Sequence, residues 1–322
     1  MIAAARDPDD ANLDRVQVIK GWVDAKGETH EKIYDVAVSG GRKVDPKTGK
    51  VSAVGNTVNL ADASYANSIG APELAAVWTD PDVDWGSFDR VIVRSPWDYY
   101  HHRDRFLLWL DRLDVVGATV QNPTAILRWN LDKTYLRELD VPLVETEWVA
   151  RGGGVDLARI LRDRHWDRAV VKPTVSGGAT DTWITTADTA AVHHARATAI
   201  LSRCGLMVQR FMPEIGTDGE WSLLFFRRRF SHAIIKRPTA GDFRVQVEHG
   251  GTATPSVPSA ALLAQAQRVV NAVDGELLYA RVDGLEVDGE LRLMELEVLE
   301  PDLFFGNAAG APRRFAEAVL AG

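Results

Sequence analysis

The sequence has only one cysteine, Cys204, among its 322 residues. No disulfide can therefore form within the chain, as is usual for proteins of a reducing compartment. Long apolar runs are also missing, so we expect no membrane-spanning segment. The N-terminal stretch MIAAARDPDDANLD lacks the basic and then apolar order of a secretory signal. These absences predict a cytoplasmic protein.

Several catalytic motifs are absent as well. The eight histidines form no HExxH pattern and no Cys/His zinc spacing, and the sequence contains neither a serine-hydrolase motif nor a GxxxxGK[ST] phosphate loop. The net charge of −8 argues against nucleic acid as the main partner. The composition, 46% hydrophobic and 25% charged, is that of a globular protein with one large domain or two to three smaller ones.

Residues 1–75 differ in pattern from the rest. RVQVIKGWVDAKGETHEKIYDVAV predicts two strands joined by the turn Ala25-Lys26-Gly27. The segment contains no chemical motif, and it resembles part of a bacterial family of unknown function. From about residue 75 strands and helices alternate, and the apolar periodicity predicts helices over residues 103–113, 155–164, 187–203, 258–273 and 312–321.

The stretch LMELEVLEPDLFF places carboxylates inside an apolar segment. In an extended strand Glu295 and Glu297 share one face, about 6.5–7 Å apart along the chain. Such a pair repels unless a cation lies between the two groups, and oxygen ligands of this kind suit Mg²⁺. The alternative is an edge strand whose glutamates face water.

Two lysines and a glycine-containing turn indicate phosphate binding. Lys172 ends the apolar strand AVVKP, and the turn TVSGGAT follows it, so backbone N–H groups and an ammonium can meet phosphate oxygens. Lys133 lies about forty residues upstream in a helical stretch. The alternatives are a hairpin turn with a surface lysine, and a solvated helical lysine.

Two further segments carry candidate binding groups. Gln209-Arg210-Phe211-Met212-Pro213-Glu214 follows a strand and can offer backbone groups to an adenine edge and Glu214 to a ribose, although Phe211 and Met212 could equally be core. Lys236 and Arg244 lie in IIKRPTAGDFR, just before Gly250 and Gly251. Cations there can neutralise a phosphate and an anionic intermediate, and the alternative is a charged surface hairpin.

Taken in order, these motifs resemble the ATP-grasp superfamily. Glu295-Leu296-Glu297-Val298-Leu299-Glu300-Pro301 is similar to the ExN-x3-P metal strand of the glutathione-synthetase branch, with glutamate in place of asparagine. SPWDYY, RWNLDK, VVKPTVSGGA, GDFRVQ and LMELEVLEP resemble a bacterial subgroup close to the cyclo-ligase of cycloserine biosynthesis. The resemblance covers residues 76–322, and the family's first strand and glycine-bearing helix are missing.

The resemblance implies an α+β fold in which two α/β subdomains clasp ATP. The expected domains are a β-rich N-terminal segment over residues 1–75, a truncated α/β pre-ATP-grasp layer over 76–125, and an ATP-grasp domain over 126–322 whose small lid subdomain covers about 130–207. It also implies ATP and one or two Mg²⁺ ions as cofactors.

The resemblance further assigns roles to individual residues. ATP would be bound by Lys133, Lys172, Ser176, Gly177, Gly178, Gln209, Phe211, Met212 and Glu214. Metal would be held by Asp283, Glu295 and Glu297. Arg244 and Lys236 would be catalytic, with Arg244 stabilising the acyl phosphate and the oxyanion.

Substrate contacts are expected near the end of the strand DRVIVRS, because ligands of open α/β sheets bind at the carboxyl ends of strands. The candidates are Arg94, Ser95, Asp98 and Tyr99, together with Gly250 and Gly251. The alternative is that Trp97 and Tyr99 belong to the core and that Asp98 caps a helix.

The implied function is an ATP-dependent carboxylate–amine ligase that forms a C–N bond through an acyl phosphate and releases ADP and phosphate. An amino-acid-derived ligase and a cyclo-ligase are two forms that this function could take. Its partners would be small-molecule carboxylate and amine substrates. We expect no nucleic-acid or membrane partner. The sequence does not decide whether the chain forms a homodimer. The alternatives are a non-catalytic ATP-grasp-like scaffold and an ATP-dependent carboxylate kinase.

The metal site depends on the loop that joins Asp283 to Glu295, because a one-residue slip reverses every face of a strand. A two-residue Asp288-Gly289 turn would place Asp283 on the core side. A three-residue loop, residues 287–289 with Gly289 left-handed, would place Asp283 diagonally beside Glu295. We expect the three-residue loop, with Asp283, Glu295 and Glu297 on one face.

Overall fold

The computed structural model describes residues 2–6, 11–24, 26–45, 50–62, 64–76, 83–94, 96–246 and 249–321. Four stretches considered above contain residues outside this set: the N-terminal stretch with Met1 and residues 7–10, the turn residue Ala25, the substrate candidate Ser95 and part of the stretch that follows residue 75. The chain divides into two compact units, Met1–Val83 and Asp84–Gly322, which are described separately. Among the described residues no helix has the length and apolar character needed to cross a membrane.

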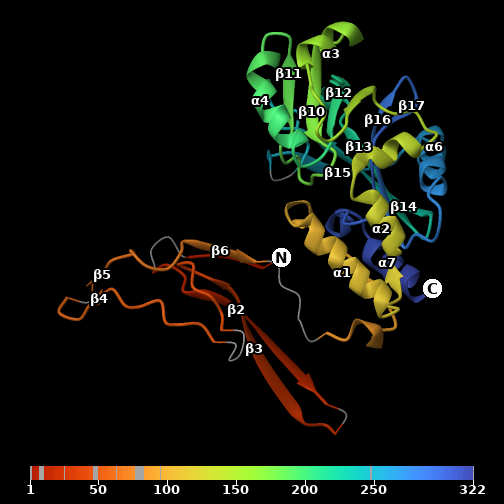
Figure 1. The fold of residues 1–322 in the computed structure, drawn as a ribbon. Helices are drawn as coiled ribbons and strands as arrows, with labels where there is room; N and C mark the ends of the chain where they lie inside the picture. The colour runs from red at the N-terminus through yellow and green to blue at the C-terminus, as the bar shows by residue number, and fades with distance from the viewer. Residues whose placement is uncertain are drawn as a thin grey trace. The chain divides into compact units, whose positions relative to one another are not determined.

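The described residues of the first unit form three antiparallel strand pairs (Figure 1). The long hairpin predicted from the sequence is confirmed, since Arg15 pairs with Val38 and Val23 with Thr29. The strands are β1 (Ile2–Ala5) with β6 (Glu73–Ala76), β2 (Arg15–Val23) with β3 (Thr29–Val38), and β4 (Val58–Asn59) with β5 (Ser64–Tyr65).

The second unit contains a five-stranded antiparallel sheet in the order β15-β14-β13-β16-β17. Its strands are β13 (Glu220–Phe226), β14 (Arg229–Arg237), β15 (Thr252–Ser256), β16 (Tyr279–Val287) and β17 (Glu290–Glu297). One face is apolar and packs against the helix α6 (Ala260–Asn271), with Leu223, Val282 and Leu296 fully buried. The opposite face is apolar at one end, where Phe226 and Tyr279 pack against Phe315, and near Leu285, which packs with Ile215 and Val245. That end is covered by α7 (Ala311–Leu320), next to η5 (Phe305–Asn307).

A second sheet of the same unit has the order β11-β10-β12-β9. Its strands are β9 (Thr146–Val149), β10 (Arg168–Pro173), β11 (Trp183–Thr186) and β12 (Leu206–Arg210). The helices α3 (Leu157–Arg164) and α4 (Ala190–Leu201) pack on it around Leu161, Ala197 and Leu206 (Figure 1). Both helices begin and end within a few residues of the predicted positions.

A small α/β layer precedes the sheets. Its parallel strands are β7 (Val91–Ile92) and β8 (Val120–Gln121), and its helical elements are η1 (Trp85–Ser87), η2 (Tyr99–His101) and α1 (Arg103–Val115). The apolar stripe predicted for this helix was Phe106, Leu107, Leu110 and Leu113. Phe106, Leu110 and Leu113 are buried, and Leu107 is half-buried. The connection to the large sheet runs through α2 (Thr124–Asn130) and η3 (Lys133–Glu138), and α5 (Glu214–Thr217) follows β12.

The hairpin between β16 and β17 corrects one prediction. Val287 pairs with Glu290, so the loop is only Asp288 and Gly289, with φ angles of 52° and 78°. The expected three-residue loop is therefore wrong. Asp-Gly tolerates the two successive positive φ angles of a type I′ turn, and this local preference decides the loop.

A β-bulge farther along the hairpin nevertheless brings Asp283 to the expected face. Gly284 pairs with Leu293 and Asp283 pairs with Glu295, which leaves Met294 as an extra residue on β17. One extra residue reverses the alternation of side chains beyond it. Asp283, Glu295 and Glu297 consequently lie on one face, as predicted. The cause is the bulge and not the expected three-residue loop.

Candidate active site

The partly uncovered face of the five-stranded sheet carries a cluster of polar side chains, which we call the charged face. Directly paired residues of antiparallel strands share a face, and four such pairs build it: Glu220 with Lys236, Ser222 with Asp283, Asp283 with Glu295, and Arg281 with Glu297. Its members are Glu220, Ser222, Lys236, Arg281, Asp283, Glu295 and Glu297.

Asp283 lies at the centre of this cluster and is 2% exposed. Arg281 donates to it from Nε at 3.0 Å and from Nη2 at 2.9 Å, and the Ser222 hydroxyl donates as well. Lys236 Nζ lies 3.5 Å away. Burial alone would raise the pKa of Asp283, but the charges of Arg281 and Lys236 outweigh it and lower the pKa.

Lys236 is bound between two carboxylates. Its Nζ donates to Glu220 Oε1 at 2.5 Å, and its side chain is 9% exposed. Burial opposes its charged form, but Asp283 and Glu220 outweigh burial and raise its pKa. Among the described residues, Lys236 is therefore a fixed cation whose charge stabilises the carboxylates of Asp283 and Glu220.

Arg281 was missed by the sequence analysis. Its guanidinium bridges Asp283 and Glu297 and donates from Nη1 to the Asp302 carbonyl at 3.1 Å. The signal was available in the sequence, because Arg281 precedes Asp283 by two residues and so shares its face of the strand.

Lys133 and Lys172 approach the charged face from η3 and β10. Lys133 Nζ donates to the Ser176 carbonyl at 2.7 Å and lies 3.0 Å from Glu295 Oε1. Burial works against its charge, but the ion pair with Glu295 outweighs burial and raises its pKa. The two lysines predicted for phosphate binding thus lie beside the predicted metal strand.

Lys172 differs from Lys133 in having no partner. Within the part of the chain that the structure describes, its ammonium has neither an ion pair nor a hydrogen bond, although the side chain is half-buried. Burial lowers its pKa, Glu295 opposes this shift, and the neighbouring charge of Lys133 adds to it. A half-buried, unpaired ammonium is a group that an anionic ligand would stabilise.

The glycine turn after β10 is braced at both ends. Lys133 N donates to the Thr174 carbonyl at 2.8 Å, and the hydroxyls of Tyr100 and Thr180 lie 3.0 Å apart. A Cβ on Gly177 would lie 3.0 Å from Tyr100 Cε1, so a larger residue would crowd that ring. Ser176 is buried and Gly178 is exposed with a φ of 56°.

The segment after β12 combines apolar packing with an unsatisfied carboxylate. Phe211 and Met212 pack, like Met294, against the buried cluster of Ile215, Val245 and Leu285. The Arg168 guanidinium lies 4.0 Å from the centre of the Phe211 ring. Gln209 Nε2 donates to the Thr146 hydroxyl at 3.1 Å. Glu214 Oε2 is buried without a hydrogen-bond partner among the described residues.

Comparison with known proteins gives the family of this chain. The cycloserine biosynthesis protein DcsG of Streptomyces lavendulae is 31% identical over 275 residues, which is 78% of this chain and 89% of that protein. The chain belongs to the DcsG family. Residues 58–122 match the family model of the D-cycloserine synthetase DcsG N-terminal domain, and residues 1–89 match a family described as a protein of unknown function, DUF3604.

Solved structures support the assignment of this chain to the DcsG family. The crystal structure of D-cycloserine synthetase DcsG superimposes with a TM-score of 0.68 at 28% identity, covering 76% of this chain and 87% of that chain. A D-alanine–D-alanine ligase from Bacillus anthracis matches with a TM-score of 0.50 at 16% identity over 66% and 73% of the two chains, and shows the fold alone. The predicted ATP-grasp fold is thus confirmed, and family membership gives the enzyme class, an ADP-forming ligase that makes C–N bonds.

In this DcsG family member the predicted substrate residues differ in burial and in hydrogen bonding. Tyr99 is 5% exposed, and burial together with the charge of Glu300 raises its pKa well above the usual range. Arg94 Nη2 donates to the Pro301 carbonyl at 2.8 Å, while its buried Nη1 has no hydrogen bond among the described residues. Asp98 precedes η2 without a side-chain capping bond, and Trp97 is 50% exposed, so only Tyr99 fits the core alternative.

Among the described residues, Arg244 has no ion pair or hydrogen bond with a member of the charged face. Its guanidinium binds Asp242, with Nη2 and Oδ2 2.7 Å apart, and this hydrogen bonding lowers the pKa of Asp242. Gly250 has a φ of 81°. A Cβ on Gly251 would lie 2.2 Å from the Val245 carbonyl oxygen, so this glycine permits close packing of the loop on itself.

The charged face fits a divalent cation chemically, but the metal site is not preformed. Its carboxylate oxygens are the ligands that Mg²⁺ prefers. Burial raises the pKa of Glu297 to about 8 and that of Glu300 to about 7, with Arg281 and Lys133 respectively opposing the shift and the neighbouring carboxylates adding to it. A cation would relieve this repulsion. However, the carboxylates do not converge, because Arg281 bridges Asp283 and Glu297.

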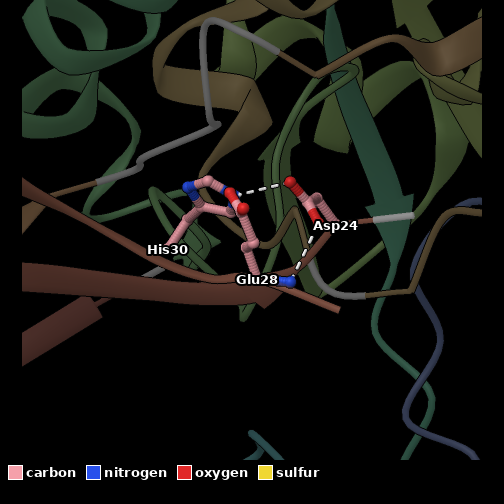
Figure 2. A group of neighbouring side chains, drawn as sticks. All are labelled: Asp24, Glu28 and His30. Atoms are coloured by element: carbon pink, nitrogen blue, oxygen red, sulfur yellow. Dashed lines mark hydrogen bonds and ion pairs between the residues drawn. The ribbon is translucent and has the colours of Figure 1, made fainter. Parts of the chain in front are cut away.

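Within the described ranges the only three candidate ligand atoms that lie within 4.8 Å of one another belong to the hairpin residues Asp24, Glu28 and His30 (Figure 2). Hydrogen bonds of the turn explain this group. Asp24 Oδ1 accepts from the backbone N–H groups of Lys26 at 2.8 Å and Glu28 at 3.0 Å, and Oδ2 lies 3.0 Å from His30 Nε2. We assign no ion to it.

Proposed function

We propose that this DcsG family member joins a small-molecule carboxylate to an amine through an acyl phosphate. The observation that carries the proposal is the unpaired, half-buried Lys172 ammonium beside the carboxylates of the charged face. Such a site has an excess cation where an anionic phosphate would lie and excess carboxylates where a metal would lie. Both needs are met at once by a nucleotide triphosphate with Mg²⁺.

The nucleotide would be held by groups that lack protein partners. Lys172 would bind phosphate oxygens. Lys133 would bind phosphate oxygens as well, while it shares its charge with Glu295. The backbone N–H groups of residues 176–178 would close over the phosphates. Glu214, whose Oε2 has no hydrogen bond, would accept from a ribose hydroxyl.

The residues that would hold Mg²⁺ are Glu295, Glu297 and Asp283, and when bound the ion would neutralise phosphate charge. The substrate carboxylate would attack the γ-phosphorus, forming the acyl phosphate and releasing ADP. The amine nitrogen would then attack the acyl carbon, and phosphate and a proton would leave. Arg281, which bridges Asp283 and Glu297, would stabilise the developing oxyanion, and the catalytic role of Arg244 stays a prediction.

The reaction can be tested by trapping its intermediate. Purified protein with ATP, Mg²⁺ and a panel of amino and hydroxy carboxylates is assayed for ADP and, in the presence of hydroxylamine, for hydroxamate. We expect carboxylate-dependent ADP release and hydroxamate formation, both lost in Lys172→Met and retained in Arg313→Met, an exposed control on α7. ADP without an amide product from any amine would identify a carboxylate kinase, and no ADP with any carboxylate would identify a scaffold.

A further inference from the structure

β17 is the edge strand of its sheet, so the backbone groups along its free edge need partners from outside the sheet. At Leu293 these partners are backbone groups. Leu293 N donates to the Pro142 carbonyl at 2.9 Å, and Val144 N donates to the Leu293 carbonyl at 3.2 Å. Beyond the bulge at Met294 the partners change from backbone groups to side chains.

Two buried side chains bind the free edge beyond the bulge, and we call them the edge clamp. The Tyr135 hydroxyl donates to the Leu296 carbonyl at 2.6 Å and accepts from Leu296 N at 2.9 Å. Asn130 Nδ2 donates to the same carbonyl at 2.8 Å, and Asn130 Oδ1 accepts from Val298 N at 3.0 Å. Tyr135 is 2% exposed and Asn130 is 8% exposed, so water competes little for these four hydrogen bonds.

The edge clamp binds the register that the bulge creates. Successive residues of a strand direct their backbone groups alternately toward its two edges. Without the extra residue of the bulge, the groups at the free edge would continue from Leu293 on odd-numbered residues. With it, they are those of Leu296 and Val298. The edge clamp therefore fits the register in which the side chains of Glu295 and Glu297 lie on the charged face.

The segment that carries the edge clamp, residues 130–135, also contacts the glycine turn. Lys133 lies within this segment, and its Nζ is 3.0 Å from Glu295 Oε1. Lys133 N donates to the Thr174 carbonyl at 2.8 Å, and the Thr174 hydroxyl donates to Asp132 Oδ2 at 3.2 Å. One short segment thus holds both the strand predicted to bind metal and the turn predicted to bind phosphate.

We infer that Asn130 and Tyr135 are positioning residues for the carboxylates of β17. By binding the backbone on both sides of Glu297, they hold Glu295 and Glu297 in a fixed relation to Lys133, so that Mg²⁺ and phosphate would meet groups that are already aligned. The inference rests on the proposed function and deepens it. If the edge clamp only satisfied buried backbone groups, its loss would lower stability but would not change how these side chains interact.

The first test needs no nucleotide and measures the coupling between Lys133 and Glu295 in the full chain. Urea unfolding of Lys133→Met, Glu295→Gln and the double variant shows by how much the two effects on stability fail to add. The cycle is repeated in Tyr135→Phe, which keeps the ring and loses one hydroxyl, and in Asn130→Leu. The coupling should be present in the wild type and smaller in both clamp variants. It should be unchanged in Leu161→Ala, a control that destabilises the chain by truncating a buried side chain of α3.

The second test measures how much Mg²⁺ strengthens the binding of a non-hydrolysable ATP analogue, by calorimetry. The wild type should gain about tenfold or more from Mg²⁺. Tyr135→Phe and Asn130→Leu should each gain less than about threefold, although neither residue contacts the ion or the nucleotide in this account. Leu161→Ala should keep the wild-type gain.

The inference is overturned if the wild type shows no coupling between Lys133 and Glu295, or if both clamp variants keep the wild-type coupling or the full gain from Mg²⁺. If the coupling depends on the edge clamp but the wild type gains nothing from Mg²⁺, the edge clamp stands and the proposed metal chemistry fails. If Asn130→Leu does not fold, Tyr135→Phe decides alone, because it removes a single oxygen atom.

Discussion

Asp283 lies directly opposite Glu295 on neighbouring strands, although the loop that joins the strands has only two residues. With that loop and a regular ladder, Asp283 would face the core. The extra residue Met294 restores the alignment, and it packs, like Phe211 and Met212, against the cluster of Ile215, Val245 and Leu285. The bulge thus links the segment predicted to hold adenine to the strand predicted to hold metal.

Lys172 and Lys133 should respond differently to substitution. Lys172→Met removes a half-buried cation without a partner, so ATP affinity should fall by about tenfold or more while the melting temperature is unchanged or higher. Lys133→Met should also weaken ATP binding, but it leaves Glu295 without its cation and should lower the melting temperature. Calorimetry of the two variants measures ATP affinity, and thermal melts measure their stability. Equal melting temperatures would contradict the predicted difference between the two lysines.

The metal-free protein should lose stability between pH 5.5 and 8.5. The pKa of Glu297 is raised to about 8 and that of Glu300 to about 7, from a usual 4.5. A raised pKa means that the folded state binds protons more tightly than the unfolded state, so this contribution is complete below about pH 4.5 and is lost as the pH rises through 7 to 8.

Urea unfolding at several pH values, with EDTA, measures this trend. The midpoint of Glu297→Gln should change less between pH 5.5 and 8.5 than that of the wild type, and added Mg²⁺ should raise the wild-type midpoint most at high pH. Parallel pH profiles for the two proteins would show that Glu297 titrates normally.

Arg281 and Arg244 should differ strongly in their effect on stability. Arg281→Met leaves Asp283 and Glu297 buried without their shared partner and should cost about 3–5 kcal/mol of unfolding free energy. Arg244→Met breaks a solvent-screened pair with Asp242 and should change the free energy of unfolding far less. Denaturant titrations of both variants give the two values, and a larger loss for Arg244→Met would contradict the arrangement of the charged face.

Much of this site was predictable from alternation and motif order. Glu295, Glu297, Lys133 and Lys172 were identified from a strand period, a glycine turn and a resemblance to the ATP-grasp superfamily, and the structure brings them together. The ATP-grasp fold was predictable for the same reason, since its motifs follow one another in a fixed order along the chain.

Other features depend on contacts that a sequence does not display. The bulge at Met294 is set by packing across the sheet, whereas the two-residue loop follows the local preference of Asp-Gly. Arg281 was passed over, although its spacing from Asp283 places both on one face of the strand, because arginine in an apolar strand carries no motif of its own. Arg244 was chosen because it lies among other basic residues, but its partner Asp242, only two residues away, holds it locally.

The most direct test of the charged face as a Mg²⁺–ATP site is the effect of Mg²⁺ on ATP affinity in Glu295→Gln and Glu297→Gln. In the wild type, Mg²⁺ should strengthen ATP binding by about tenfold or more. Both variants should lose most of this gain, and Glu295→Gln, which frees Lys133, should bind metal-free ATP at least as tightly as the wild type. If both variants keep the full gain from Mg²⁺ and release ADP at the wild-type rate, the account is contradicted.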